Sequence, residues 1–332
     1  MGSYSNMTID SGGLDLSFHA TESWAPYVID GARVNMVTLG DRERGPIAIL
    51  LSLPAFGRPI DPETGFGEDT VHHHPSDGLR LILRGDFMVG REYYRPGEAR
   101  LQAGGEFYGP EAFGPVVARG DTPCWLIVAF LDRRGGGMYV ADPAGQARSD
   151  AIEAHMLPLF ERLGIDRALG ETDGYSTLAC SLAGDVEQGR FNLSSSGGPD
   201  WERFDGFQAA LSLGGDKNVG PVIITISADA GATAVPPGII GPEIMMIVTS
   251  GSCVAGESCY RDGDIRLFGE AAALPEIVAG PSGAGLYLIL GNRAELDLKP
   301  ATGNPGARAW SRWIMRNLDA LRYDAPIARH SA

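Results

Sequence analysis

Hydrophobic residues occur along the chain in short runs that end at Gly, Pro or Asp. Two examples are IAILLSL (47–53) and EIMMIVTSG (243–251), which have the length of single β-strands and contain several β-branched residues. Many short strands separated by tight turns are typical of β-sandwiches and β-barrels. The pattern therefore predicts an all-β fold with a few packing helices.

Two stretches follow a helical period instead. The first, residues 149–164, begins with Ser149 as a cap and ends at Gly164, and Pro158 is predicted to kink it. The second, residues 304–322, begins with an Asn cap followed by Pro in the first turn. The predicted apolar faces are Ile152, Met156, Leu159, Phe160 and Leu163 in the first helix and Trp310, Trp313, Ile314, Leu318 and Leu321 in the second.

The chain also repeats itself. The segment DGARVNMVTLGDRERGPIAILLS (30–52) matches DGFQAALSLGGDKNVGPVIITIS (205–227), and GDFMVGREYYRPGEARL (85–101) matches GSCVAGESCYRDGDIRL (251–267). Strands of period two joined by Gly-rich turns favour jelly-roll barrels, which leave few open sheet edges. We therefore expect two barrels in tandem: a first domain over 1–148, a helical linker over 149–200, and a second domain over 201–332 that ends in a helix.

The composition limits the kinds of partner that the protein is expected to bind. The formal net charge of −15 argues against nucleic acid or an anionic membrane, and the apolar runs are too short to span a bilayer. The N-terminus lacks the pattern of a secretory signal. The four cysteines form neither a disulfide framework nor a zinc pattern (Cys124, Cys180, Cys253 and Cys259). We expect a cytoplasmic protein with a small-molecule partner, and both a monomer and a homodimer remain open.

The segment HHHPSDGLRLILRG, from residue 72, resembles the first motif of the cupins, in which two histidines separated by one residue precede an acid and a glycine. His72, His74 and Gly85 match this spacing, whereas Gly78 stands where the family has glutamate. The segment YRPGEARLQAGGEFYGPEAFGP (94–115) resembles the second motif but lacks its final histidine. The resemblance covers about 30–135 and 205–295 and implies a bicupin, a class that includes dioxygenases, isomerases, lyases and storage proteins.

The repeat offers an internal control for these residues. Groups needed for folding should occur in both copies, whereas groups that occur once are better candidates for chemistry. At the offset of the second matching block, His72, His74, Asp77 and Arg80 correspond to Gly238, Ile240, Glu243 and Met246. The candidate chemistry is therefore confined to the first domain, and the second domain is expected to be structural or to shape a pocket lid or a dimer surface.

On a strand, His72 and His74 project to one face and His73 to the other. The cupin resemblance implies that this face is the barrel interior, where the two imidazoles could bind a divalent metal such as Fe, Mn, Ni or Zn. Such a site needs at least a third protein ligand, for which Asp77 or Glu111 is the candidate.

Without a metal, His72 or His74 would act as general base and Arg80 would hold a substrate carboxylate or enolate. Arg80 shares the parity of the two histidines, which favours an inward orientation if no bulge intervenes. Replacing Arg80 by Met, the residue at the equivalent position, is expected to change stability by less than about 1 kcal/mol.

The catalytic candidates are thus His72, His74, Arg80 and Asp77. A small, partly aromatic pocket suited to an organic acid or ring is predicted around them, with the substrate-binding candidates Gln102, Tyr108, Glu111 and Phe113. We expect a cupin-type enzyme for a small anionic or aromatic metabolite, either a metal-dependent dioxygenase or a lyase or isomerase. The alternative is a non-catalytic bicupin that binds or stores a small molecule.

Overall fold

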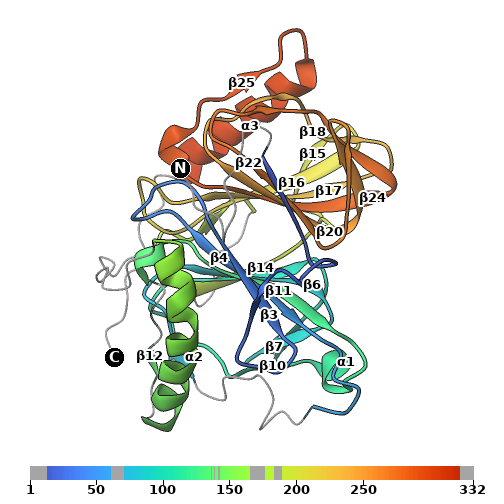
Figure 1. Ribbon diagram of the computed structural model, residues 1–332. Helices are drawn as coiled ribbons and strands as arrows, with labels where there is room; N and C mark the ends of the chain where they lie inside the picture. Colours follow the sequence, from blue (N-terminus) through green and yellow to red (C-terminus); the bar gives the residue numbers. More distant parts are fainter. Residues whose placement is uncertain are drawn as a thin grey trace.

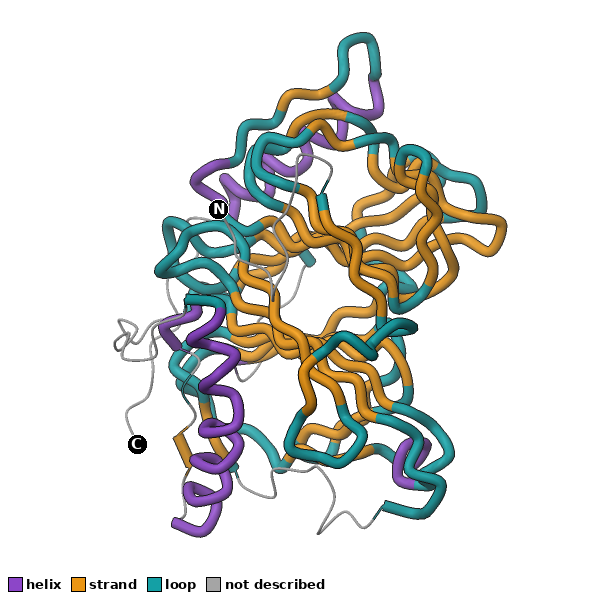
Figure 2. Tube along the Cα trace, in the orientation of Figure 1, coloured by secondary structure: helices purple, strands orange, loops and turns teal. Residues whose placement is uncertain are grey.

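The computed structural model describes residues 13–60, 71–135, 137, 139–140, 143–164, 176–182 and 189–321. Figure 1 shows two β-domains stacked on each other, the first drawn below and the second above. Strands dominate both, and the helices lie at the periphery (Figure 2). The predicted all-β fold with a few packing helices is confirmed.

The first domain is built on an antiparallel sheet with the strand order β14-β9-β6-β11-β4-β3-β2. Two small sheets, β10-β7-β8 and β12-β5, complete it. Its strands are β2 (Ala25–Pro26), β3 (Arg33–Thr38), β4 (Ile47–Leu53), β5 (His72–His73), β6 (Gly78–Arg84), β7 (Phe87–Val89), β8 (Glu92–Tyr94), β9 (Glu98–Gln102), β10 (Glu111–Phe113), β11 (Cys124–Phe130), β12 (Tyr139–Val140) and β14 (Arg190–Ser194).

The second domain repeats this plan with the order β1-β22-β20-β24-β17-β16-β13, to which β15, β18 and β21 attach. A small sheet, β23-β19-β25, accompanies it. Its strands are β1 (Leu14–Ser17), β13 (Ala179–Cys180), β15 (Glu202–Phe204), β16 (Phe207–Leu213), β17 (Val222–Ala228), β18 (Thr233–Val235), β19 (Gly238–Ile239), β20 (Ile244–Ala255), β21 (Ser258–Arg261), β22 (Asp264–Phe268), β23 (Ala273–Leu274), β24 (Ile277–Leu290) and β25 (Lys299–Pro300).

The repeat extends to the pairing of individual residues. In the first domain His72 lies opposite Val140 and also forms a bridge with Tyr108. In the second domain Gly238 lies opposite Pro300 and opposite Leu274 in the same manner. The two domains therefore have matching registers, so residues at equivalent positions occupy equivalent places in space.

The domains exchange strands. β1, near the N-terminus, pairs with β22 of the second domain, with Leu14 opposite Leu267. β14, which lies inside the segment expected to be the linker, pairs with β9 of the first domain, with Phe191 opposite Leu101. This exchange corrects the expected division at residues 148 and 200, because residues 14–17 complete the second sheet and residues 190–194 complete the first.

Three apolar clusters make up the core, one inside each domain and one between them. Successive side chains of β6 point to opposite faces of the sheet. Leu79 and Leu81 belong to the cluster between the domains, whereas Ile82 belongs to the interior of the first domain. The interdomain cluster also takes Met245 and Ile247 from β20. One face of each main sheet is thus buried against the other domain, and the opposite face lines its own interior.

The helices are α1 (Pro115–Ala118), α2 (Pro143–Arg162) and α3 (Pro305–Leu321). α2 begins at Pro143 rather than after Ser149, and Pro158 lies inside it without ending it. Proline fits the first turn of a helix, where its missing N–H has no intrahelical acceptor. α3 has the predicted cap, because Asn304 Oδ1 accepts a hydrogen bond from Ala307 N at 2.9 Å. Among the described residues, no helix is long and apolar enough to cross a membrane.

Candidate functional site

A group of polar side chains occupies the interior of the first domain. Strand β5 places His72 there with 0 % of its surface exposed, and His74 follows with 9 %. Their ring centroids lie 5.3 Å apart, and the His72 ring lies 4.4 Å from that of Tyr108. The backbones of His72 and Tyr108 bond to each other in both directions, at 3.0 and 2.9 Å, so the two side chains are held together by main-chain geometry.

The imidazole of His74 is neutral at physiological pH. Burial lowers its pKa well below the usual 6.5, and the positive charge of Arg80 and the neighbouring His72 act in the same direction. Its Nδ1 lies 2.9 Å from the carbonyl oxygen of Gly137. Because a carbonyl only accepts hydrogen bonds, Nδ1 carries the proton, which leaves Nε2 as the basic nitrogen.

Arg80 reaches the same interior from β6, with 4 % of its surface exposed. Its Nε forms an ion pair with Glu111, and its Nη2 donates a hydrogen bond to the hydroxyl of Tyr108. The guanidinium also lies over the Tyr108 ring, 4.4 Å from its centroid. Arg80, Tyr108 and Glu111 thus form one buried unit whose positive charge has a counter-charge inside the domain.

A second buried arginine, which the sequence reasoning missed, lies beside this unit. Arg100 stands opposite Arg80 on β9 and donates hydrogen bonds to Gln102 Oε1 through Nε and Nη2, at 3.1 and 2.5 Å. It also contacts Tyr94 OH at 3.2 Å. The second domain has Arg266 at the equivalent position, so Arg100 belongs to the repeated framework. The repeat itself was the signal that could have revealed it.

Aromatic side chains close the group on its apolar side. Phe113 is buried on β10, as expected for a residue that lines the interior. Phe130, which the sequence did not single out, ends β11 with its ring 4.6 Å from that of His74. His73 points the other way, stacks on the exposed Tyr139 at 5.2 Å and meets Phe107 at 4.7 Å.

Asp77 does not join the interior group, which corrects its assignment as a catalytic residue or metal ligand. Its Oδ1 accepts a hydrogen bond from Gly104 N at 2.8 Å, and its Oδ2 accepts one from Gly215 N of the second domain at 3.0 Å. It is 2 % exposed. Asp77 lies in the segment between β5 and β6, and its hydrogen bonds place the carboxylate at the junction between the domains.

The expected divalent metal does not fit the described residues. No group of three His, Cys, Asp or Glu side chains within them stands close enough to hold a metal ion. The two imidazoles supply two ligands, Glu111 is engaged by Arg80, and Asp77 is engaged at the domain junction. Since a stable site needs at least a third protein ligand, we derive no chemical step through a metal.

The second domain provides the comparison that isolates this group. At the positions equivalent to the polar side chains, its interior is occupied by hydrophobic residues or glycine. His72, His74, Arg80, Gln102, Tyr108 and Glu111 correspond to Gly238, Ile240, Met246, Phe268, Leu274 and Ile277. Except for the glycine, these second-domain residues all belong to the apolar core of that domain. The same fold therefore forms its interior without the polar side chains.

No family model matches the chain, and no curated protein matches it in sequence. Solved structures resemble it at low identity. Oxalate decarboxylase from Bacillus subtilis is 12 % identical with a TM-score of 0.44, covering 96 % of this chain and 84 % of that one. Vicilin from hazelnut, Corylus avellana, is 10 % identical with a TM-score of 0.45, covering 95 % and 98 %. Protein Ylba from E. coli is 12 % identical with a TM-score of 0.45, covering 87 % and 95 %.

These likenesses are too remote to say anything of activity. The protein itself has two antiparallel β-domains whose main sheets have corresponding strand orders, with two smaller sheets in the first domain and one in the second, each domain around its own core. The two β-domains in tandem that the sequence predicts are confirmed.

Proposed function

We propose that the first domain is an acid–base enzyme, a lyase or an isomerase, that acts on a small organic acid. One observation carries the proposal. Ionisable and hydrogen-bonding side chains fill the interior of the first domain at positions where the second domain, with the same fold, has apolar residues. Folding therefore does not require them, and buried charged or polar groups cost free energy unless their interactions compensate. Their presence in one copy alone supports a chemical role.

In this proposal His74 is the general base. Its Nε2 takes a proton from the carbon next to the substrate carboxylate, because the depressed pKa keeps the ring neutral and available. The electron pair of the broken C–H bond moves into an enolate, whose negative charge lies against Arg80 and the hydroxyl of Tyr108. Return of the proton to another carbon completes an isomerisation, and loss of a leaving group completes an elimination.

Glu111 has a supporting role here. Its ion pair with Arg80 Nε fixes the guanidinium plane, so that the Nη side of the fork stays against Tyr108. His72 packs against both His74 and Tyr108, with ring centroids 5.3 and 4.4 Å away. Each of these residues is buried, which strengthens their electrostatic interactions.

The proposal can be tested without knowing the substrate. Mixtures of small carboxylic acids are incubated with the protein in D₂O, and loss of C–H signals is followed by proton NMR. A general base that removes a proton exchanges it for deuterium even where the overall reaction stalls. We expect exchange into one or a few acids with the wild type and none with the variant His72→Gly/His74→Ile, which carries the residues of the second domain.

His155→Ala is the matched control, because His155 lies outside the group and its ring contacts the backbone oxygen of Pro26. This variant should exchange like the wild type. An acid that binds in a thermal-shift assay, loses this binding in Arg80→Met and yet shows no deuterium exchange would support the binding-protein alternative and not the enzyme. Exchange that survives in the double histidine variant would remove the histidines from the site.

A further inference from the structure

Asp77 lies where three parts of the chain meet. Its Oδ1 accepts hydrogen bonds from Gly104 N at 2.8 Å and from Ser176 Oγ at 2.5 Å. Its Oδ2 accepts hydrogen bonds from Thr177 N at 3.1 Å and from Gly215 N at 3.0 Å. These donors come from the first domain, from the segment that links the domains and from the second domain. One buried carboxylate therefore joins all three.

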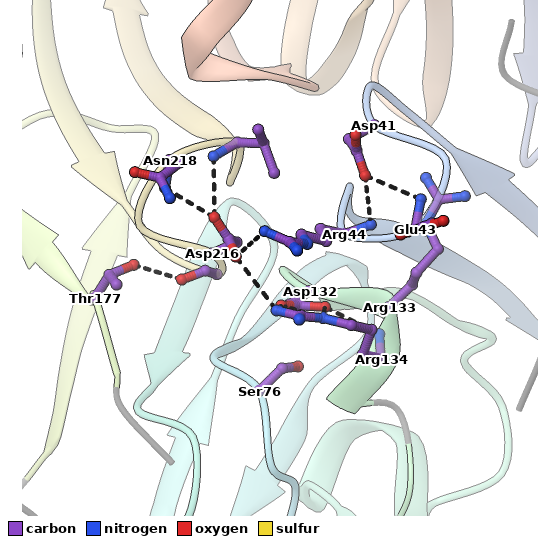
Figure 3. Close-up of polar contacts among 12 residues, drawn as sticks. Asp41, Glu43, Arg44, Ser76, Asp132, Arg133, Arg134, Thr177, Asp216 and Asn218 are labelled. Atoms are coloured by element: carbon purple, nitrogen blue, oxygen red, sulfur yellow. Dashed lines mark hydrogen bonds and ion pairs between the residues drawn. The ribbon is translucent and has the colours of Figure 1, made fainter. Parts of the chain in front are cut away.

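The bond from Asp77 to the second domain has a counterpart at the equivalent position. Glu243 Oε2 accepts a hydrogen bond from Gly40 N at 3.0 Å, and Gly40 corresponds to Gly215 in the repeat. Each domain thus offers a carboxylate to a loop of the other. Figure 3 shows one side of this junction, where Thr177 Oγ1 donates to the oxygen of Gly215 at 2.7 Å and Arg134 links Asp132 to Asp216.

Asp77 differs from its counterpart in what stands next to it. It lies three residues after His74 and three before Arg80, and its partner Gly104 begins the segment that carries Tyr108. Gly105 N in this segment donates to the oxygen of His74 at 2.7 Å. A side chain at position 104 would collide with the backbone of Pro75, so the two segments touch directly.

We propose that Asp77 is the positioning residue of the site. Through Gly104 it holds the segment bearing Tyr108 against the segment bearing His74, and through Gly215 it fastens both to the second domain. The second domain thereby supports the geometry of a site to which it contributes no side chain of the interior group. The inference rests on the proposed function in one respect, that His74 and Tyr108 are the acting groups.

The test compares Asp77→Asn with Glu243→Gln in the full-length protein. Both substitutions keep the shape of the side chain and weaken a bond between the domains, but only the first lies beside the site. The protein is labelled with ¹⁵N-histidine, and the imidazole nitrogens are recorded by NMR at one fixed pH. The signals of His74 are assigned by their loss in His74→Ile. We expect Asp77→Asn to shift the His74 Nδ1 and Nε2 signals and to speed exchange of its Nδ1 proton, and Glu243→Gln to leave them unchanged.

Unchanged His74 signals in Asp77→Asn would overturn the proposal, and so would equal shifts in both variants, which would indicate general loosening of the junction. If Asp77→Asn does not fold, Ser176→Ala replaces it; this variant removes one donor and should shift the His74 signals in the same direction by less. An unchanged His74 spectrum there would also count against the proposal. The NMR comparison measures no turnover, so its outcome does not depend on the outcome of the deuterium-exchange test.

Discussion

Removing one partner of the ion pair between Arg80 and Glu111 is expected to lower the free energy of unfolding. The two side chains are 5 % and 10 % exposed, so removing one partner leaves the other as an uncompensated charge in the interior. Breaking a buried pair in this way costs about 3–5 kcal/mol. Arg80→Met should therefore lower the free energy of unfolding by that amount, which replaces the cost below about 1 kcal/mol expected from the sequence alone.

The double variant Arg80→Met/Glu111→Ile should recover most of the loss. It introduces the pair found in the second domain, Met246 and Ile277, both fully buried in an apolar core. Replacing a buried ion pair by apolar side chains of similar volume is often neutral or stabilising. Tyr108 loses a hydrogen-bond partner, at about 1 kcal/mol. The double variant should thus be more stable than Arg80→Met, although it carries one substitution more.

Urea denaturation followed by circular dichroism measures both effects, with an unchanged m-value as the condition for comparing the variants. Arg316→Met is the matched control, because its ion pair with Glu202 lies on the surface with side chains 65 % and 43 % exposed. It should change stability by less than about 1 kcal/mol. If Arg80→Met costs no more than this control, or the double variant is less stable than the single one, Arg80 and Glu111 do not form a desolvated pair.

The variant His72→Gly/His74→Ile should keep the far-ultraviolet circular dichroism spectrum of the wild type, because the second domain folds with these residues; an unfolded variant would make the histidines structural. Below pH 6.5 the His74 side chain is protonated in the unfolded chain but not in the folded protein, because burial lowers its pKa, so the free energy of unfolding should fall as the pH falls. The variant His74→Gln should show a weaker pH dependence in urea titrations at several pH values. Asn304→Ala should cost about 1 kcal/mol through loss of the cap of α3, and a calorimetric midpoint equal to that of the wild type would contradict the cap.

Much of the architecture could be predicted because its signals lie in short segments of the sequence and occur in both copies of the repeat. Strand length, turn glycines and the two matched blocks predict two β-domains, and alternation along β6 predicts that Arg80 faces inward. The apolar faces of α2 and α3 follow from periodicity, and buried members of both lie in the cores. The start of α2 was harder to predict, because a proline at position 143 suits a first turn as well as it suits a loop.

The partnerships inside the site could not be predicted, because they join residues far apart in the chain. The pairing of Arg80 with Glu111 depends on which strands lie across the interior, and the bond from Asp77 to Gly215 spans 138 residues. Sequence spacing alone cannot tell a carboxylate aimed at the interior from one aimed at the neighbouring domain. Arg100 differs, because it occurs in both copies of the repeat, as Arg266 in the second, and the comparison between the copies therefore marks it as framework and not as a candidate for chemistry.

The exchange of β1 and β14 bears on how the protein folds. The first domain lacks its outer strand until residues 190–194 are made, and the pairing of Leu14 with Leu267 closes a loop of most of the chain. Contacts of such long range slow folding, because the entropy of loop closure is lost before the contact forms. A nascent chain therefore holds its first strand unpaired until the second domain emerges from the ribosome. For the same reason, a cut between the domains should yield two fragments that reach the native state only together.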